Sequence, residues 1–344
     1  MKPAAPGTAN AVKAAWVAIT ANQMVWPTAV EAGYFDKYGV NFSLQYVQGS
    51  VKSVQAMVAG DLNMVQVAGS AVVAAQATKQ DLVMAAGFLN ETVWRIMGGP
   101  AIKTVEDLKG KTVAVTQVGN ADYFAWTLLA KKQGWKPEDF KFAPSGDANG
   151  QVAVLQSNQV QAIAVSPPND VQAQKVGAHL VVDEATFHEP EQQVGMGLAK
   201  AYIAQNRAAA LGVVKASIEA IHRWKTDPAF AKKVIQKYLK SDDQAYIDDG
   251  YSAYASTFPE VPYPTKEGFT NTIEQVSTQQ PNAKNVTADQ CMDLSLVKEL
   301  EDSGFIKQIY GASAAASGQS AASGGASAKP AASGAASAKP AASR

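Results

Sequence analysis

Residues 42–88 read FSLQYVQGSVKSVQAMVAGDLNMVQVAGSAVVAAQATKQDLVMAAGF, and two hydrophobic periodicities alternate along them. The first six residues alternate apolar and polar side chains, which is typical of a half-buried strand. Val51, Val54 and Val58 then follow at helical spacing, and Gly60 ends that pattern. The stretch predicts strands and helices in turn, at 42–47, 51–59, 64–68, 71–78 and 82–88. Such a series predicts a mostly parallel sheet flanked by helices.

The same alternation extends in both directions. Upstream, we expect a strand at 16–19 and a helix at 28–33. Downstream, a second series has predicted strands at 112–115, 140–143, 162–165 and 179–182, with helices at 122–133, 148–157 and 169–176 between them. The second series is complete enough to form a small α/β lobe of its own.

The pattern becomes helical after about residue 195. Apolar side chains recur every three or four residues, and Asp227-Pro228 predicts a helix start. The expected helices are 206–224, 228–239, 242–254, 266–277 and 293–302. Because these helices cannot bury their faces alone, we expect them to pack on the first lobe. The predicted division is lobe one at 10–95 plus 190–310 and lobe two at 96–189. Two crossings, near 91–98 and 187–195, would form a hinge.

The end of the chain differs in composition. Residues 311–344 are Ala, Ser, Gly, Lys and Pro except for Gln319 and Arg344, and the segment ASAKPAAS occurs twice at a spacing of ten. With no large apolar residue to bury, this tail is predicted to be disordered, either as a solvated appendage or as a tether to a wall or membrane surface. The first seven residues, MKPAAPG, lack the apolar core of a signal peptide and resemble a mature N-terminus behind an added Met1.

Charge and cysteine content exclude several functions. The chain of 344 residues has 30 basic and 30 acidic side chains, and the tail holds three basic residues and no acid, so residues 1–310 carry a net charge of −3. Nucleic-acid binders usually carry a basic excess instead. Cys291 is the only cysteine and the three histidines are scattered, which argues against disulfides and Cys-based zinc sites. No apolar run is long enough to span a membrane. We expect a monomer without metal, cofactor or nucleic acid.

Ligands of open α/β sheets bind beyond the carboxyl ends of the strands. The residues predicted at those ends are mostly small and neutral, with amide or hydroxyl groups, and a few are aromatic or acidic. The candidate ligand-binding residues are Asn22, Gln23, Trp26, Gly49, Ser50, Gly69, Ser70, Asn90, Glu91, Gln117, Asn120, Asp122, Tyr123, Ser166 and Asn169. No catalytic residue is predicted, because no nucleophile motif or phosphate-binding loop is present.

Each candidate has an ordinary structural alternative. Gly-Ser pairs before helices expose backbone N–H groups to a ligand, but they are also common helix caps. Trp26, Trp94, Tyr123 and Trp126 could line a pocket or fill the core. Asp122 could hold a cationic group, act as an acid, or cap a helix. Glu91 could form a salt bridge with Arg95, the main source of a guanidinium clamp.

Three segments resemble a known family. They are residues 26–40, WPTAVEAGYFDKYGV, residues 56–64, AMVAGDLNM, and residues 104–115, TVEDLKGKTVAV. They are similar to ABC-transporter solute-binding proteins of the nitrate/sulfonate/taurine type, a group that includes binders of thiamine-pyrimidine precursors. The resemblance implies a two-lobe type II periplasmic-binding-protein fold, a periplasmic or other extracytoplasmic location, and delivery of a solute to an ABC permease. It places the pocket at loops 22–26, 49–50, 69–70, 117–123 and 166–169.

Two departures from the family pattern bear on the ligand. Gly119-Asn120-Ala121-Asp122 stands where the family often has a small hydroxyl pair for an anion, so the acid weakens the case for nitrate or a free sulfonate. Enzymes related to this family carry a cysteine-rich motif, which the lone Cys291 does not provide. We expect a receptor rather than an enzyme. Carboxylate- or sulfonate-bearing solutes rank just ahead of neutral or cationic heterocycles. A sensor module, or less readily an enzyme acting on a heterocycle, remains an alternative.

Overall fold

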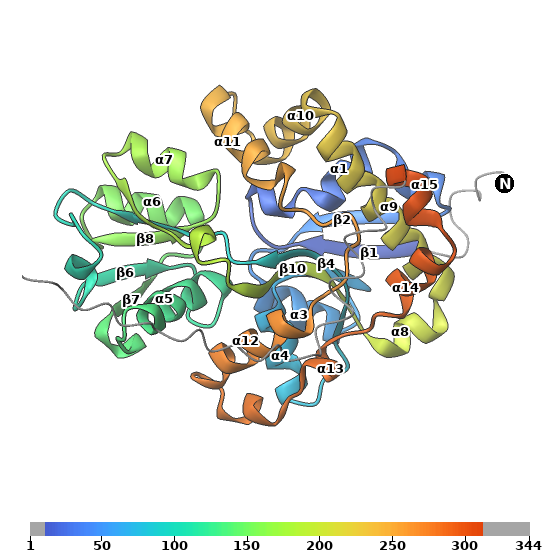
Figure 1. Cartoon of the computed structure of the whole chain (residues 1–344), viewed down its shortest axis with the longest axis horizontal. Coiled ribbons are helices and arrows are strands. Elements are labelled where there is room, and N and C mark those ends of the chain that lie inside the picture. Colours follow the sequence, from blue (N-terminus) through green and yellow to red (C-terminus); the bar gives the residue numbers. More distant parts are fainter. Residues whose placement is uncertain (1–10, 312–344) are drawn as a thin grey trace, which may run out of the picture.

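The computed structural model describes residues 11–311, which fold around two five-stranded sheets (Figure 1). The predicted tail lies outside the described residues, except for Gly311. We call the part of the chain built on the first sheet lobe one and the part built on the second sheet lobe two. Among the described residues, no helix combines the length and apolar character needed to cross a bilayer.

The sheet of lobe one is mostly parallel. Its strand order is β2-β1-β3-β10-β4, and β10 alone runs antiparallel to its neighbours within it. The strands are β1 (Ala11–Trp16), β2 (Asn41–Tyr46), β3 (Met64–Val67), β4 (Val83–Glu91) and β10 (Pro190–Leu198). Four of the five strands therefore precede lobe two in the sequence, and β10 returns from it.

The sheet of lobe two repeats this plan. Its order is β7-β6-β8-β5-β9, with β5 antiparallel to both of its neighbours. The strands are β5 (Arg95–Gly98), β6 (Thr112–Val115), β7 (Lys141–Pro144), β8 (Ala162–Val165) and β9 (His179–Asp183). In each sheet the antiparallel strand is the one that the chain enters on crossing from the other lobe.

Helices cover both faces of each sheet (Figure 1). In the first half of lobe one they are α1 (Val25–Glu31), α2 (Tyr34–Lys37), α3 (Ser50–Val58) and α4 (Gly69–Ala77). In lobe two they are α5 (Ala121–Lys132), α6 (Ala148–Gln156) and α7 (Asn169–Lys175). The C-terminal helices are α8 (Lys200–Gln205), α9 (Arg207–Thr226), α10 (Pro228–Leu239), α11 (Gln244–Ala255), α12 (Lys266–Ser277), α13 (Ala288–Cys291), α14 (Ser295–Asp302) and α15 (Phe305–Tyr310).

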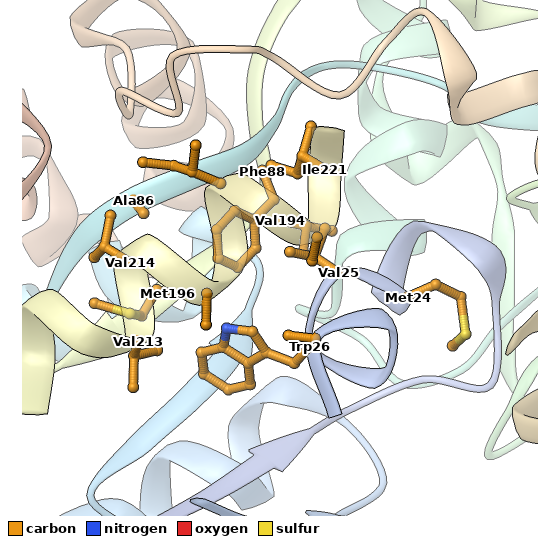
Figure 2. Packing of buried hydrophobic residues seen from close by; sticks show 14 of the residues in the cluster. Met24, Val25, Trp26, Ala86, Phe88, Val194, Met196, Val213, Val214 and Ile221 are labelled. Carbon is orange, nitrogen blue, oxygen red and sulfur yellow. The ribbon is translucent and has the colours of Figure 1, made fainter. Parts of the chain in front are cut away.

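Trp26 anchors the main core of lobe one. Its ring is fully buried among aliphatic side chains of α1, α9 and the sheet, and it meets Phe88 edge-on at 6.3 Å between ring centroids (Figure 2). The indole Nε1 donates to Ser217 Oγ of α9 at 3.2 Å, so the buried polar atom is satisfied. This packing joins α9 to the sheet and to α1 of lobe one.

Two short links join the lobes. Residues 92–94 lead from β4 to β5, and residues 184–189 lead from β9 back to β10. The links lie side by side, since the Thr92 amide donates to the Glu189 carbonyl at 3.2 Å and the Glu184 amide donates to the Trp94 carbonyl at 2.8 Å. Backbone rotation in two such short segments is sufficient for one lobe to swing against the other.

The structure corrects two strand predictions. The first strand is β1, which ends at Trp16 where the predicted strand begins, because the alanine-rich segment before Trp16 supplies the buried strand. The second correction is β10, which was expected only as a crossing and the start of a helical region. Gly195 and Gly197 interrupt its apolar pattern. Gly195 is required there because the sulfur of Met84 and the carbonyl of Ala86 occupy the position of a Cβ.

Candidate functional site

A cleft lies between the two lobes and is open to solvent. The empty space within it and at its mouth is about 870 Å³. Loops that follow β1, β2 and β3 form one wall, and loops that follow β6, β7 and β8 form the other. The link 92–94 contributes Trp94, and strand β10 contributes Gln193 and Val194. The cleft therefore lies at the strand ends of both sheets, where ligands of α/β proteins bind.

The walls combine apolar side chains with neutral hydrogen-bonding groups. Val17, Ile19, Val165 and Val194 are among the apolar residues, and Tyr46 and Trp94 supply aromatic surface. Within the described part of the chain, the lining contains no lysine, arginine or histidine, and its charged residues are Asp122 and Asp147. The formal charge of the lining is thus negative when both carboxylates are ionised.

Eight of the candidate residues line this cleft. They are Asn22, Gln23, Gly49, Ser50, Asn120, Asp122, Ser166 and Asn169. They belong to both lobes, so the strand-end rule brings residues about 150 positions apart in the sequence to one site.

Two aromatic candidates fill the core instead. Trp26 lies in the packed centre of lobe one (Figure 2). Tyr123 is buried on the inner face of α5 and packs against Phe142 at 4.8 Å between ring centroids. Trp126 is likewise buried in the core, and of the four aromatic residues considered from the sequence, Trp94 lines the cleft.

The other five candidates outside the lining are Gly69, Ser70, Asn90, Glu91 and Gln117. Both polar atoms of the Asn90 side chain have partners within lobe one. Its Nδ2 donates to the Tyr263 carbonyl at 2.9 Å, and its Oδ1 accepts from Gln192 Nε2 at 2.7 Å. Gly69 packs against Gln192 at the start of α4. Gln117 is exposed and does not line the cleft. Packing therefore explains the places of Asn90 and Gly69, and exposure that of Gln117.

Asp122 is a fully buried carboxylate at the wall of the cleft. It accepts hydrogen bonds from the Thr116 amide, from Thr116 Oγ1 at 2.8 Å and from Gln151 Nε2 at 2.9 Å. Thr116 Oγ1 in turn accepts from Asn120 Nδ2 at 3.0 Å. Burial raises the pKa of Asp122 to about 6, against the opposing effect of the Thr116 hydrogen bonds. The carboxylate is therefore ionised above neutral pH and is surrounded by donors.

Several buried polar atoms of the lining have no hydrogen-bond partner among the described residues. The acceptors are Asn22 Oδ1, Asn120 Oδ1, Gln151 Oε1 and Gln193 Oε1, and the donors are Trp94 Nε1, Asn169 Nδ2 and Gln193 Nε2. Buried polar groups are nearly always paired in native proteins. Their concentration in one cleft indicates a place where a bound molecule completes the hydrogen bonding.

Direct contacts join the lobes around this cleft. Thr20 Oγ1 lies 2.9 Å from Ser166 Oγ and donates to the Pro167 carbonyl at 2.9 Å. At another point Gln48 Nε2 donates to the Gly146 carbonyl at 2.9 Å. The Tyr246 hydroxyl of α11 donates to Asn169 Oδ1 at 2.9 Å. The structure thus has the two lobes in contact across the cleft.

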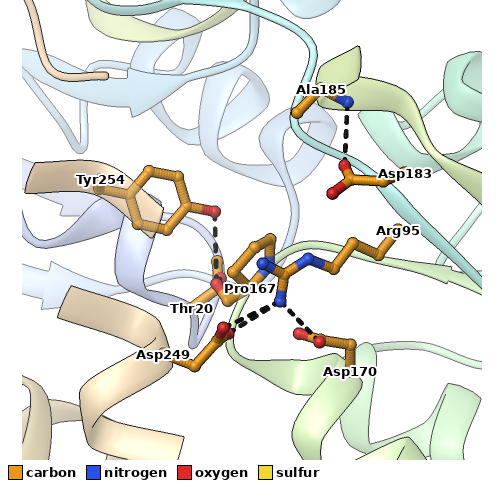
Figure 3. Close-up of polar contacts among 8 residues, drawn as sticks. All are labelled: Thr20, Arg95, Pro167, Asp170, Asp183, Ala185, Asp249 and Tyr254. Carbon is orange, nitrogen blue, oxygen red and sulfur yellow. Dashed lines mark hydrogen bonds and ion pairs between the residues drawn. The ribbon is translucent and has the colours of Figure 1, made fainter. Parts of the chain in front are cut away.

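Arg95 forms a further inter-lobe contact but does not line the cleft. Its guanidinium Nη1 lies 2.6 Å from Asp170 in lobe two and 3.0 Å from Asp249 of α11 in lobe one (Figure 3). The i+4 spacing suggested that Arg95 pairs with Glu91, but its partners are Asp170 and Asp249. Trp94, the preceding residue, lies in the lining, which agrees with the opposite orientation of neighbouring side chains in a strand.

Sequence reasoning left several lining residues out of the site. They are Tyr46, Gln48, Thr116, Asn149, Gln151 and Gln193. Tyr46 and Gln48 are two positions apart at the end of β2, so the strand period could have identified them. Gln151 lies one turn beyond the Asp147 N-cap of α6, at i+4, so helical spacing could have identified it. Gln193 could not be found because β10 was not predicted as a strand.

Comparisons with known proteins agree with this architecture. The family model described as NMT1/THI5 like matches residues 21–231. Similar solved structures include a protein from Bordetella bronchiseptica RB50, with 19% identity, a TM-score of 0.74 and coverage of 85% of this chain and 97% of that chain. No protein of curated function matches this chain.

Two further similar structures are named for the solutes that they bind. The periplasmic aliphatic sulphonate-binding protein SsuA from Escherichia coli is 18% identical, with a TM-score of 0.67 and coverage of 83% of this chain and 92% of that chain. The periplasmic nitrate-binding protein NrtA from Synechocystis PCC 6803 is 14% identical, with a TM-score of 0.66 and coverage of 89% and 90%. These likenesses establish the two-lobe periplasmic-binding-protein fold predicted from the sequence.

Proposed function

Because the chain belongs to the NMT1/THI5-like family, we propose that it is an extracytoplasmic receptor that captures a small organic molecule between its lobes and delivers it to a membrane ABC permease. The observation that carries this proposal is the inter-lobe cleft, whose lining comes from both sheets and whose buried polar atoms lack partners. Two similar structures support it, since one is a periplasmic sulphonate-binding protein and the other a periplasmic nitrate-binding protein.

The moving units of this receptor are the two lobes, which are separated at the links 92–94 and 184–189; Arg95, expected at the end of lobe one, begins β5 of lobe two. A ligand that contacts both walls binds the closed form more tightly than the open form and shifts the population towards it. The paired links at 92–94 and 184–189 would act as the hinge. The closed form is then what a permease would recognise, and the receptor itself is proposed to act as a monomer.

We infer binding rather than catalysis at this site. Asp122 is engaged by Thr116 and Gln151, and Asp147 accepts from the Gly150 amide as the N-cap of α6. Glu91, the other acid considered for catalysis, does not line the cleft. The hydroxyl bonded to Asp122, Thr116 Oγ1, also accepts from Asn120 Nδ2, and among the described lining residues no histidine, lysine or cysteine accompanies the two acids.

The test is a thermal-shift screen of small metabolites, followed by measurement of lobe closure by small-angle X-ray scattering. We expect at least one compound to raise the melting temperature and to reduce the radius of gyration. Native mass spectrometry of the purified protein would reveal a ligand that co-purifies. The receptor proposal is wrong if no compound stabilises the protein, or if the bound compound is chemically converted.

A further inference from the structure

We propose that Asp122 sets the hydrogen-bond polarity of the cleft, so that the site takes a ligand that offers N–H donors and carries no negative charge. The ligand class is a neutral amide or N–H heterocycle, or a cation such as an amidine. This inference rests on the proposed receptor function and narrows its ligand. Asp122 acts as a positioning residue, because it works through Thr116, Asn120 and Gln151.

The first step concerns Gln151. An ionised carboxylate accepts hydrogen bonds and cannot donate them. The amide nitrogen of Gln151 must therefore point to Asp122, where the Nε2–Oδ2 distance is 2.9 Å. This orientation leaves Gln151 Oε1 as a buried acceptor without a partner, on a residue that lines the cleft.

The second step concerns Asn120. The Thr116 hydroxyl has one proton, and it donates that proton to Asp122 Oδ1 at 2.8 Å. Thr116 Oγ1 can then only accept from Asn120, so the nitrogen of the Asn120 amide faces Thr116 at 3.0 Å. Asn120 Oδ1 is again left without a partner. One buried charge thus orients two amides so that both offer carbonyl oxygens.

On the opposite wall, Asn22 Oδ1 is a third buried acceptor without a partner. A sulfonate or carboxylate placed against these oxygens would leave them unpaired and would meet like partial charges. Leaving a buried acceptor unpaired is costly, so discrimination by such groups is strong. An N–H group pairs with each of them. Trp94 Nε1 and Asn169 Nδ2 are buried donors without a partner. Because each needs an acceptor, we infer that the ligand also carries a neutral acceptor.

The charges of the lining agree with this polarity. Among the described lining residues, no basic side chain is present to neutralise an anion, whereas Asp122 and Asp147 both disfavour one. Arg95, the nearest candidate clamp from the sequence, is already paired with Asp170 and Asp249. Because burial raises the pKa of Asp122 only to about 6, its carboxylate remains ionised above neutral pH and holds this orientation.

The test compares ligands of one shape and three charges. Benzoate, benzamide and benzamidine are titrated above neutral pH by thermal shift and calorimetry. A wider panel adds nitrate, alkanesulfonates, aliphatic amides, amines and imidazoles at millimolar concentration. We expect the binders to be neutral or cationic. An anion as the tightest binder overturns the charge inference and leaves the receptor function intact. No binding in any charge class refutes the receptor function and this inference with it.

Variants then test the role of Asp122. In Asp122→Asn the amide can donate as well as accept, so Asn120 and Gln151 are free to reverse. We expect affinity for the best ligand to fall roughly ten-fold and the preference against anions to weaken. Asp139→Asn is the matched control, since Asp139 also accepts from a backbone amide in lobe two but lies outside the cleft. Equal affinity and equal charge preference in both variants would overturn the positioning role.

A second pair keeps the test decisive if Asp122→Asn does not fold. Gln151→Met preserves the length of the side chain but removes the carbonyl acceptor from the cleft. We expect a roughly ten-fold loss of affinity for an N–H ligand. Gln117→Met is its control, because Gln117 is exposed and outside the lining. An unchanged affinity in Gln151→Met would show that the oriented carbonyl does not contact the ligand.

Discussion

The ion pair between Arg95 and Asp249 should stabilise the closed arrangement of the lobes. Arg95 belongs to β5 of lobe two and Asp249 to α11 of lobe one, and two contacts of 3.0 and 3.1 Å join them (Figure 3). The pair must break when the lobes separate. Asp249→Asn removes the charge without changing the shape of the side chain, so it perturbs this contact with little effect on the packing of α11.

The size of the effect follows from exposure and from the second partner of Arg95. The Asp249 side chain is 26% exposed, so solvent weakens the pair, and such pairs contribute at most about 1 kcal/mol. Asp170 remains 2.6 Å from Arg95 in the variant, so no buried charge is left without a partner. We therefore expect a loss of about 1 kcal/mol, which is about five-fold in the ratio of closed to open protein.

Lobe separation can be measured by electron-electron double resonance between spin labels. Lys52 in lobe one and Lys141 in lobe two are exposed positions for cysteine labels, and the native Cys291 is buried. Asp249→Asn should increase the open population and should weaken ligand binding by up to the same factor. Asp248→Asn is the control, because Asp248 pairs at 2.7 Å with Lys232 within lobe one. If the two variants give the same distances and affinities, the Arg95–Asp249 pair does not stabilise closure.

Three further predictions concern stability. Trp26→Leu should lower the free energy of unfolding by about 3 kcal/mol in urea denaturation without changing ligand affinity; lost affinity with unchanged stability would instead place Trp26 in the site. Gly69→Ala should cost about 1–3 kcal/mol in the same assay, since the added Cβ would lie 2.6 Å from the Gln192 carbonyl oxygen; wild-type stability would contradict that clash. Burial raises the pKa of Glu191 from 4.5 to about 7, so the folded protein holds a proton that the unfolded chain releases, and stability should fall as pH rises from about 5 to 7. Glu191→Gln should reduce this fall by up to roughly 3 kcal/mol in denaturation series across that range, and an unchanged pH dependence would rule out Glu191 as its source.

Local periodicity was sufficient to predict most of the fold. The predicted strands at 112–115 and 162–165 coincide with β6 and β8, and the predicted helix at 228–239 coincides with α10. Each of these segments has a regular apolar pattern and clear ends. The pattern fails at β10, where Gly195 is required by contacts with β4, a strand about 110 positions away. Close packing between distant segments can demand a residue that contradicts the local pattern.

The site was predicted as far as the strand-end rule extends. That rule places a loop at the cleft but does not say which side chain of the loop faces it. Gln117 and Asn120 lie on one loop, and only Asn120 lines the cleft, because its amide is held by Thr116. Trp26 follows a strand-end loop but lies within α1, whose buried face meets α9. Side-chain direction depends on tertiary contacts, which the sequence pattern does not contain.

Asp122 shows how a residue can be important for a reason that composition does not suggest. From the sequence, an acid beside the loop disfavours an anionic ligand by charge. In the structure the carboxylate is buried behind Thr116 and Gln151, so much of its effect on a ligand passes through the groups it orients. Replacing a fixed charge by oriented dipoles makes the site selective for donors rather than merely for positive charge. Neutral N–H ligands and cations can therefore share the site, whereas an anion cannot satisfy the same oxygens.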